Sequence, residues 1–569
     1  MKKTFVAIAM MAVCAAGYAQ NSAPLSYMYD GITNNIENSY GTARSVALGN
    51  AMTAIGGDLG SVVINPAGGA VAKYNQVEFT PGISISSVTS AFSPSGESNY
   101  GFSSVENRTR MNFPGFGASF CMNTGHDYGL RSFTFGLIVT QTQDYNSSFS
   151  AGGRNDRTSL LAEFANGARG NYSKDLSSFD SGVSWDLVCG YNGRLFGGID
   201  ETEYAGNSEI YTLAGYCVPS ALAQTSSVTT NGYRRDILMN FAFDINNRLY
   251  LGLSLGLPVM YKNIQEGYFE SPDNYMDFYI SLPDKGGQMV GTYYKGATYQ
   301  FSQYTRMSGI YGKFGFIFLP MDNLRIGGAI KTPVAFSISE GYRYLASSTY
   351  ENSSCNGYSY SPQDEWSFRM RSPWSFNVGV AYTFGAHGLF SVDYELTDYK
   401  SMMYSEVRNR TDYFYKVNKV INSFCGASHN VRAGLEWRFN PMFTARAGFT
   451  LLTSPEKFYT SMNGTVTASD SYYTDSLIPI NSGTSHYYRD LRTSYSLGFG
   501  YSSPGSFFAD FAARLNRTPA AVYTPFYDYD HVDINGDFHE VGTSSEELSP
   551  RILNNGRLWD IMLTIGFRF

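Results

Sequence analysis

The stretch RLWDIMLTIGFRF, residues 557–569, ends the chain and gives the first indication of its fold. Bulky apolar side chains occupy alternate positions of this stretch: Trp559, Ile561, Leu563, Ile565, Phe567 and Phe569. Polar or small residues stand between them: Asp560, Thr564, Gly566 and Arg568. Successive side chains of a strand point to opposite faces, so this strand has one apolar face and one polar face. Such a strand suits a wall with lipid on one side and an aqueous lumen on the other.

The N-terminus predicts export from the cytoplasm. Met1-Lys2-Lys3 is basic, residues 4–16 are mostly apolar, and Gly17 and Ala19 place small residues three and one positions before Gln20. This pattern is typical of a secretory signal peptide that is removed after Ala19. The apolar stretch is too short to span a bilayer as a helix. Cys14 leaves a lipid-modified N-terminus open as an alternative, but the preceding Val13 matches that processing site poorly.

Composition narrows the class of protein further. No other stretch approaches eighteen consecutive apolar residues, so the sequence predicts no transmembrane helix. The chain holds 45 tyrosines and 40 phenylalanines, and tyrosine suits membrane interfaces. Its net charge of −7 argues against a nucleic-acid partner. Five cysteines remain after cleavage, an odd number without metal-type spacing, which leaves a Cys189–Cys217 disulfide open.

Alternation of apolar and polar residues recurs along the chain and predicts fourteen strands. The even number is what a bacterial single-chain barrel requires. We therefore predict an all-β fold, a 14-stranded antiparallel transmembrane β-barrel. The predicted strands are residues 77–89, 112–122, 132–144, 236–245, 249–262, 308–319, 324–341, 366–384, 389–402, 430–439, 442–453, 494–502, 506–516 and 557–569.

The connections between these strands alternate in length. Short turns rich in Asn, Asp, Pro and Gly follow the even-numbered strands from the fourth onward, as at Asn246-Asn247 and Ser503-Pro504-Gly505. Longer connections follow the odd-numbered strands, and the longest runs from Tyr145 to Arg235. Outer-membrane barrels have short periplasmic turns and long outer loops, which agrees with a periplasmic C-terminus. A soluble β-sandwich is the alternative, but it would not produce this regular alternation of short and long connections.

Three regions follow from this map. Residues 1–19 are the signal peptide, residues 20–76 precede the first strand, and residues 77–569 form the barrel with long extracellular loops. Residues 20–76 do not alternate, and Ala43–Ile55 reads as a short helix. Because a barrel of this size encloses a lumen, we expect these residues to form a plug inside it. A disordered periplasmic leader is the alternative.

The segment GTARSVALGNAMTAIGGDLGSVVINPAGG, residues 41–69, resembles the N-terminal hatch of the long-chain fatty-acid transporter family of the FadL/TodX type. The specific element is Asn65-Pro66-Ala67, which matches the NPA motif of that hatch. The style of the chain is similar to a Bacteroides-like subgroup often labelled hemin receptor. The terminal Phe569 also resembles the assembly signal of outer-membrane barrels.

This resemblance implies a fourteen-stranded barrel closed by a hatch. A hydrophobic molecule would land on an extracellular groove, enter an internal pocket and leave sideways through the wall. No motif of this chain matches the family's ligand-contacting residues, so the ligand stays open.

Two groups of residues are candidates for ligand binding. The first is apolar and lies in the long 145–235 connection: Leu160, Leu161, Phe164, Trp185 and Leu187. An exposed apolar patch on a loop would be a binding surface. The alternative is that these side chains pack on each other and hold the loop closed.

The second group consists of charged residues on the polar faces of the later strands: Asp393, Glu395, Arg432, Glu436, Arg438, Arg446, Asp510 and Arg514. Opposite charges on neighbouring strands predict ion pairs that brace the hatch. The alternative is a clamp for a ligand carboxylate, in which Arg432 and Arg446 would make charge-assisted hydrogen bonds.

Other chemistry has little support in the sequence. Heme would need a His or Tyr ligand, and His486, His531 and His539 fall in predicted loops. The stretch 528–537, DYDHVDINGD, lacks the ligand pattern of a calcium loop and reads better as a hairpin. No nucleophile–base set stands out. We therefore predict no catalytic residues, no metal site and no cofactor, so the chain is not expected to be an enzyme.

The function that these patterns favour is passive uptake of hydrophobic compounds, such as long-chain fatty acids, across the outer membrane of a Gram-negative cell. The alternative is a surface receptor or adhesin, for example one that binds hemin, that uses the barrel as a platform. The expected partners are hydrophobic small molecules, outer-membrane lipids and the barrel assembly machinery. We expect a monomer with no nucleic-acid partner.

Overall fold

The computed structural model of the chain describes residues 19–37, 40–94, 103–168, 171–197, 220–407, 413–456, 459–460, 466–467, 491–518, 520–526 and 550–569. The predicted signal peptide lies outside these ranges except for its last residue, Ala19.

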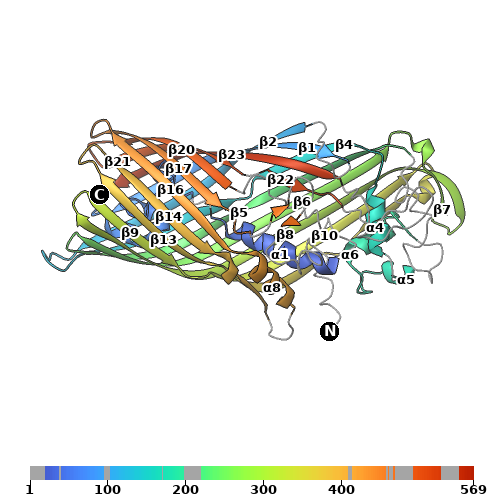
Figure 1. Cartoon of the computed structure of the whole chain (residues 1–569), viewed down its shortest axis with the longest axis horizontal. Helices are drawn as coiled ribbons and strands as arrows, with labels where there is room; N and C mark the ends of the chain where they lie inside the picture. Colours follow the sequence, from blue (N-terminus) through green and yellow to red (C-terminus); the bar gives the residue numbers. More distant parts are fainter. Residues whose placement is uncertain are drawn as a thin grey trace.

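The strands form one closed antiparallel barrel of fourteen wall positions (Figure 1). Strand β1 (Gln76–Ser93) pairs with β2 (Ser103–Asn123) on one side and with the last strand, β23 (Arg551–Arg568), on the other, which closes the barrel. The strands between them follow in chain order: β3 (Leu130–Asp144), β5 (Leu222–Ile245), β6 (Leu249–Pro272), β8 (Met289–Met321), β9 (Leu324–Lys331) with β10 (Ala335–Tyr350), β12 (Asp364–Arg371) with β13 (Trp374–Thr383), β14 (Gly388–Asp398) with β15 (Met403–Glu406), β16 (Ala427–Arg438), β17 (Phe443–Thr453), β20 (Leu491–Ser502) and β21 (Phe507–Arg517).

The predicted fourteen-stranded barrel is therefore confirmed, with a difference at three wall positions that each hold two strands. Pro333 separates β9 from β10, and Pro373 separates β12 from β13. Proline has no N–H to donate to a ladder, so each strand stops at it and restarts beyond it. At the third position the 3₁₀ turn Tyr399–Ser401 separates β14 from β15. Alternation alone did not predict these interruptions, because it reads through a single proline.

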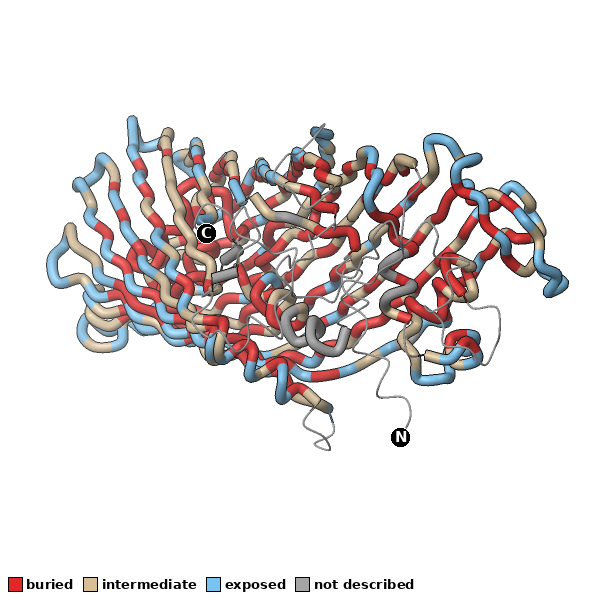
Figure 2. Tube along the Cα trace, turned by 45° about the vertical axis from the view of Figure 1, so that its right-hand side comes forward, coloured by how far each residue is buried: buried red, intermediate tan, exposed pale blue. Residues whose placement is uncertain are grey.

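Exposed and buried residues alternate along the strands at the short-turn end of the barrel (Figure 2), and the exposed ones form an apolar band on its outer face. Leu251, Leu253 and Leu255 of β6 are each 38–40% exposed, whereas the intervening Ser254 is 1% exposed. Similar exposed rows occur on β8, β13 and β23, at residues such as Phe314 and Val378. An outward row of apolar side chains with buried polar neighbours is the pattern of a barrel wall in lipid.

The wall continues well beyond this band, toward the long loops. Strands β5 and β6 each have 24 residues, and β8 has 33. Four short strands extend the sheet here: β4 (Ser147–Asn155) pairs with β5, β7 (Tyr279–Pro283) with β8, β11 (Gly357–Tyr360) with β10, and β22 (Ala521–Tyr523) with β23. Helices α4 (Leu160–Ala168), α5 (Ser173–Leu176) and α6 (Trp185–Asn192) lie at this end (Figure 1). Much of what the sequence predicted as loop is therefore ordered wall and cap.

The N-terminal segment, which we define as the described residues of the range 19–75, packs against the inner side of the barrel wall. It contains α1 (Ala19–Asn35), α2 (Ala43–Ala47), α3 (Leu59–Ile64) and the 3₁₀ helix η2 (Pro66–Ala70). Helix α2 contacts β17, β20 and β21, whereas η2 contacts β5, β6 and β8 on the far side of the barrel. Helix α8 (Tyr415–Phe424) packs against α1. Among the described residues, none of the helices is long and apolar enough to cross a bilayer.

The helix predicted at Ala43–Ile55 is shorter than expected. It ends at Ala47, because Gly49 and Asn50 both adopt positive φ angles, +61° and +58°. Left-handed residues end a right-handed helix. The apolar residues between 51 and 55 pack in a turn. Their spacing is similar to that of a helix, and this similarity led to the wrong prediction.

The apolar band gives a prediction for assembly. Leu253→Arg should lower the free energy of unfolding by about 2–4 kcal/mol, because it places a charge in the lipid region. Gln265→Arg is the matched control, since Gln265 is exposed on the same strand but lies beyond the band. The measurement is the folded fraction against urea in lipid vesicles. Equal losses in both variants would contradict this placement of the band.

Candidate functional site

Local caps hold the short helices of the N-terminal segment. Thr42 and Ser45 form a reciprocal capping box at the start of α2. Asp58 caps α3 by accepting a hydrogen bond from the Ser61 N–H at 3.0 Å. The Thr42 hydroxyl donates to the Asp58 carboxylate and so joins the two caps. These bonds satisfy N–H groups that helices of five and six residues would otherwise leave unpaired inside the barrel.

The Asn65-Pro66-Ala67 motif joins the N-terminal segment to the wall. The Asn65 side-chain oxygen accepts from the Ala67 N–H at 3.1 Å, while its amide donates to the Thr53 carbonyl at 2.6 Å and to the Phe316 carbonyl of β8 at 3.0 Å. Pro66 begins η2, and its carbonyl accepts from the Asn240 amide of β5 at 3.0 Å. One buried asparagine therefore fixes the bend and attaches it to the barrel.

Glycines in the wall let the N-terminal segment approach this closely. A Cβ at Gly315 would collide with the Asn65 side-chain oxygen, and one at Gly252 would collide with the Ala67 backbone nitrogen. At Gly327 the carbonyl of Thr53 fills the same space. The lumen-facing glycines therefore mark the places where the N-terminal segment contacts the wall. Their positions on the polar faces of the strands are visible in the sequence.

Ion pairs brace the segment near the short-turn end of the barrel. The Arg44 guanidinium lies 3.0 Å from Glu436, which also pairs with Arg446 at 2.8 Å. Arg446 makes a further ion pair with Asp510. The Asp393 carboxylate accepts from the Thr53 N–H at 2.8 Å. Arg44, Glu436, Arg446 and Asp510 line a cavity of about 470 Å³ that opens at this end.

The two arginines predicted as a ligand clamp both have partners inside the barrel. Arg432 lies 2.9 Å from Glu395 and donates to the Asn377 side chain at 2.7 Å. Arg446 belongs to the brace around Glu436. A clamp role for either arginine stays a prediction.

Helix α1 fills an apolar chamber in the middle of the barrel. Its side chains Tyr27, Met28 and Ile32 are buried. The chamber is lined by aromatic and methionine side chains of the wall and of the residue that precedes α8: Met260, Met307, Phe336, Phe368, Met370, Met402, Tyr404 and Phe414. The Tyr27 ring stacks edge-on against Phe368, Tyr404 and Phe414, with centroid distances of 5.4–5.6 Å. The chamber is therefore as apolar as a protein core, and α1 occupies it.

Cations at the edge of this chamber pair with carboxylates of the N-terminal segment. Lys262 of β6 lies 3.0 Å from Asp30. Glu37 pairs with Arg234 of β5 at 3.0 Å and with Lys331 of β9. Both lysines and Arg234 are at least nine-tenths buried. This cluster was not predictable from the alternation of apolar and polar residues, because that pattern does not show which strand positions lie next to α1.

The strand ladder is interrupted between β2 and β3. Their pairing runs only from Asn123 to Gly115 on β2. Beyond Gly115, β2 pairs only with β1, and Pro114 has no N–H to offer. We call this interruption the β2–β3 ladder break. The ladder break lies at the height of the apolar band. The neighbouring Gly82 of β1 is paired with Met562 of β23, and Met562 lies between the outward-facing Trp559 and Leu563.

Polar groups of the N-terminal segment and of the wall surround the ladder break. The Tyr40 N–H donates at 3.1 Å to the carbonyl of Gln141, at the point where β3 leaves β2. The Arg110 side chain donates to the Gly232 carbonyl at 3.0 Å and lies 3.6 Å from Asp144. A small cavity adjoins the ladder break on the lumen side, between the N-terminal segment and Gly115.

The apolar loop candidates lie in the cap. Leu160, Leu161, Phe164 and Leu187 are buried in one core with wall aromatics such as Tyr299. Trp185 is half-buried and donates from its indole nitrogen to the Phe179 carbonyl at 2.9 Å. These side chains pack on each other and on the wall, as the second sequence interpretation expected. A ligand-binding role for them stays a prediction.

A buried carboxylate anchors this cap to the wall. Glu270 of β6 accepts from the Ser159 and Tyr294 hydroxyls and from the Leu160 N–H at the start of α4. In α6, burial raises the pKa of the Cys189 thiol to about 11, so this thiol stays protonated at neutral pH. Cys217 and the three loop histidines, His486, His531 and His539, lie outside the described residues.

Of the comparisons with known proteins, those with solved structures gave matches. No family model and no curated protein matches the chain. Among solved structures, it is similar to a Pseudomonas aeruginosa FadL homologue at 12% identity and a TM-score of 0.44, with 93% of this chain and 98% of that chain covered. The P. putida toluene transporter TodX matches at 12% identity and a TM-score of 0.44, with 94% of this chain and 99% of that chain covered. The CymD monoaromatic hydrocarbon channel matches at 11% identity and a TM-score of 0.42, with the same coverage of 94% and 99% of the two chains.

The contact between Asn65 and the wall can be tested on a single strand. Gly315→Ala should displace η2, because the added methyl group meets the Asn65 side chain. With a strain of about 1 kcal/mol, trypsin should cleave after Arg44 roughly fivefold faster. Gly312→Ala is the control, since its Cβ would be 3.8 Å from the nearest atom. Identical cleavage rates in the two variants, followed by mass spectrometry, would contradict the contact.

Proposed function

We propose that this chain is an outer-membrane protein for passive passage of hydrophobic compounds that carry a carboxylate, with long-chain fatty acids as the model substrate. The observation that carries the proposal is the occupation of the apolar chamber by α1. The helix presents apolar side chains to the chamber, while Asp30 and the nearby Glu37 neutralise its cations. A fatty acid presents the same two chemical features, an apolar chain and a carboxylate.

Displacement of α1 would leave a site that such a molecule fits. Lys262 would lose Asp30, and Lys331 would lose Glu37 if that residue moves with the helix, whereas Arg234 would keep its contact of 3.5 Å with Asp236 on β5. A desolvated cation without a partner is costly, so a ligand carboxylate would be favoured there. The ligand and α1 would therefore compete for one chamber.

The lining of the chamber favours a class of compounds over a single compound. Four wall methionines, Met260, Met307, Met370 and Met402, contribute to it. Methionine is flexible and polarisable, so it packs against apolar shapes that differ in length and branching. The proposed selectivity is accordingly for a carboxylate head with an adaptable apolar tail.

The N-terminal segment is the proposed hatch, and the β2–β3 ladder break is the proposed exit. The Arg44–Glu436 brace and the Asn65 contacts support a hatch that blocks passage along the barrel axis. At the ladder break no pairing between strands has to be broken, only the bond from Tyr40 to Gln141, and the outward Met111 beside it is 81% exposed. Exit there would release an apolar compound sideways into the bilayer, so its chain would not have to enter water.

The carboxylate preference is the first test. Wild-type protein should bind oleate at least about tenfold more tightly than methyl oleate, because a charge-assisted hydrogen bond contributes roughly 1.5–3 kcal/mol. The double variant Lys262→Met with Lys331→Met should bring this ratio toward one. Lys73→Met is the control, because Lys73 is half-exposed and pairs with Asp244 away from the chamber. Competition with a fluorescent fatty acid gives the affinities, and an unchanged ratio in the double variant would contradict the proposal.

Competition by α1 is tested with the same assay. Met28→Ala with Ile32→Ala removes apolar contacts of α1 with the chamber. Both the acid and the ester should then bind more tightly, by about tenfold if roughly 1.4 kcal/mol of helix docking is lost. Weaker binding of both compounds would show that α1 forms part of the site and does not compete for it.

A further inference from the structure

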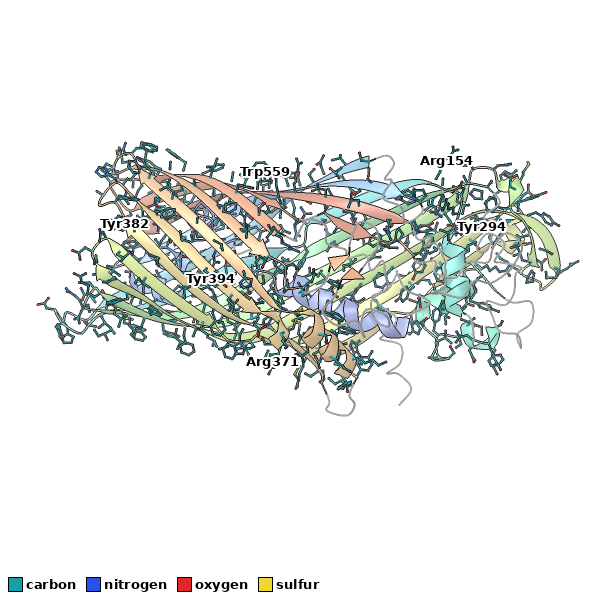
Figure 3. The ribbon with its side chains drawn as sticks, in the orientation of Figure 1. Arg154, Tyr294, Arg371, Tyr382, Tyr394 and Trp559 are labelled. Carbon is teal, nitrogen blue, oxygen red and sulfur yellow. The ribbon has the colours of Figure 1, made fainter. Side chains whose placement is uncertain are left out.

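A cluster of arginines faces outward on the barrel wall, just beyond the apolar band. Arg306 of β8 and Arg369 and Arg371 of β12 are exposed, and Arg235 of β5 is half-buried. We call these four residues the arginine patch. Figure 3 labels Arg371 at the outer edge of the barrel, close to α8. The proposed transport route does not use these side chains, because they point away from the lumen.

Strand register shows that the patch is continuous across five neighbouring strands. Tyr261 of β6 is paired with Tyr233 on one side and with Arg306 on the other. One row closer to the band, Ser337 of β10 is paired with Arg369, and the next row pairs Ala335 with Arg371. Neighbouring strands lie roughly 4.8 Å apart, so the patch is about 20 Å wide.

Small hydroxyl side chains form the floor between the arginines. Most outward positions between the arginines are serines: Ser308, Ser337, Ser339, Ser367 and Ser405. Val259, in contrast, lies between Arg235 and Ser308. Long arginine and tyrosine side chains therefore border a surface of short ones. Such a surface offers hydroxyl groups to a polar ligand that lies flat on the wall.

The patch keeps most of its positive charge. Among the described residues, no ion pair joins Arg306, Arg369 or Arg371 to a carboxylate. The Arg306 guanidinium lies over the Tyr304 ring at 5.1 Å, and that of Arg235 over the Tyr233 ring at 4.3 Å. Glu365 is the nearby carboxylate on the outward rows of β12, and it accepts a hydrogen bond from Ser339.

Apolar side chains of the band begin directly below the patch. Ile310 is paired with Ala335, one strand from Arg371, and is 49% exposed. Trp374 follows Arg371 by three residues and is 41% exposed. A ligand on this surface would therefore meet cations, then hydroxyls, and then a lipid-facing apolar wall.

We propose that the arginine patch binds the phosphorylated headgroup of a glycolipid in the outer leaflet. Guanidinium groups bind phosphate through paired hydrogen bonds, and the serine floor and tyrosine rings suit a sugar. The acyl chains would lie on the apolar band. The inference rests on the proposed function only in placing the barrel in an outer membrane with its short turns in the periplasm.

The test uses the purified full-length protein in detergent and native mass spectrometry. The probes are lipid A with both phosphates and its dephosphorylated form, each tested with and without millimolar inorganic phosphate. Wild-type protein should retain the phosphorylated form at least tenfold more strongly. The triple variant Arg306→Gln, Arg369→Gln and Arg371→Gln should lose this preference. Equal retention of both lipids by the wild type would overturn the proposal, and full displacement by inorganic phosphate would reassign the patch to free phosphate.

Two further variants separate the patch from general charge and from folding. The control Arg131→Gln, Arg154→Gln and Arg248→Gln removes three charges away from the patch, two at the short-turn end and one on β4, and should keep the lipid preference. The triple Arg→Lys variant at Arg306, Arg369 and Arg371 keeps the charge but loses the planar fork, and its retention should be intermediate. Loss of lipid in the control triple would overturn the assignment. Oleate binding should stay unchanged in all three variants, so failure of this inference is distinguishable from failure of the transport proposal.

Discussion

Every backbone N–H and C=O group that faces lipid must find a partner within the protein, and the rest of this structure depends on that constraint. A closed ladder meets it, because β23 pairs with β1 and leaves no free edge. Where the ladder is interrupted, other groups take over. At the β2–β3 ladder break Pro114 removes one donor, and Tyr40 supplies another to the Gln141 carbonyl. The N-terminal segment therefore completes the wall at the place where the wall is weakest.

The lumen is a second region in which stability and passage compete. A permanently packed core would close the barrel, whereas an empty apolar chamber would be unstable in water. Helix α1 resolves this conflict by filling the chamber with side chains on a segment that is joined to the wall mainly by ion pairs and apolar contacts. The firmer attachments, through Asn65 and Arg44, lie toward the short-turn end. In the proposed function, α1 can leave while the rest of the segment stays.

Much of the wall was predictable, because alternation records which face of a strand meets lipid. All fourteen wall positions follow from that signal. The alternation of apolar and polar residues is weaker beyond the apolar band, because both faces of β5 and β8 are largely polar or aromatic there. The outer extensions of these strands were therefore predicted to be loops. The chamber was not predictable from periodicity, although residues 20–76 hold only five charges, Asp30, Glu37, Arg44, Asp58 and Lys73. So few charges in a buried segment imply a specific partner for each, but only the fold identifies Lys262 or Arg234.

The central claim is that α1 and an acidic amphiphile occupy the same chamber. A crystal structure with a long-chain fatty acid brominated at its chain end tests this most directly. The account predicts anomalous bromine signal among Met260, Phe368 and Met402, the ligand carboxylate beside Lys262 or Lys331, and α1 displaced from its present position. Bromine signal confined to the outer apolar band, with α1 still packed on Phe368 and Tyr404, would contradict it.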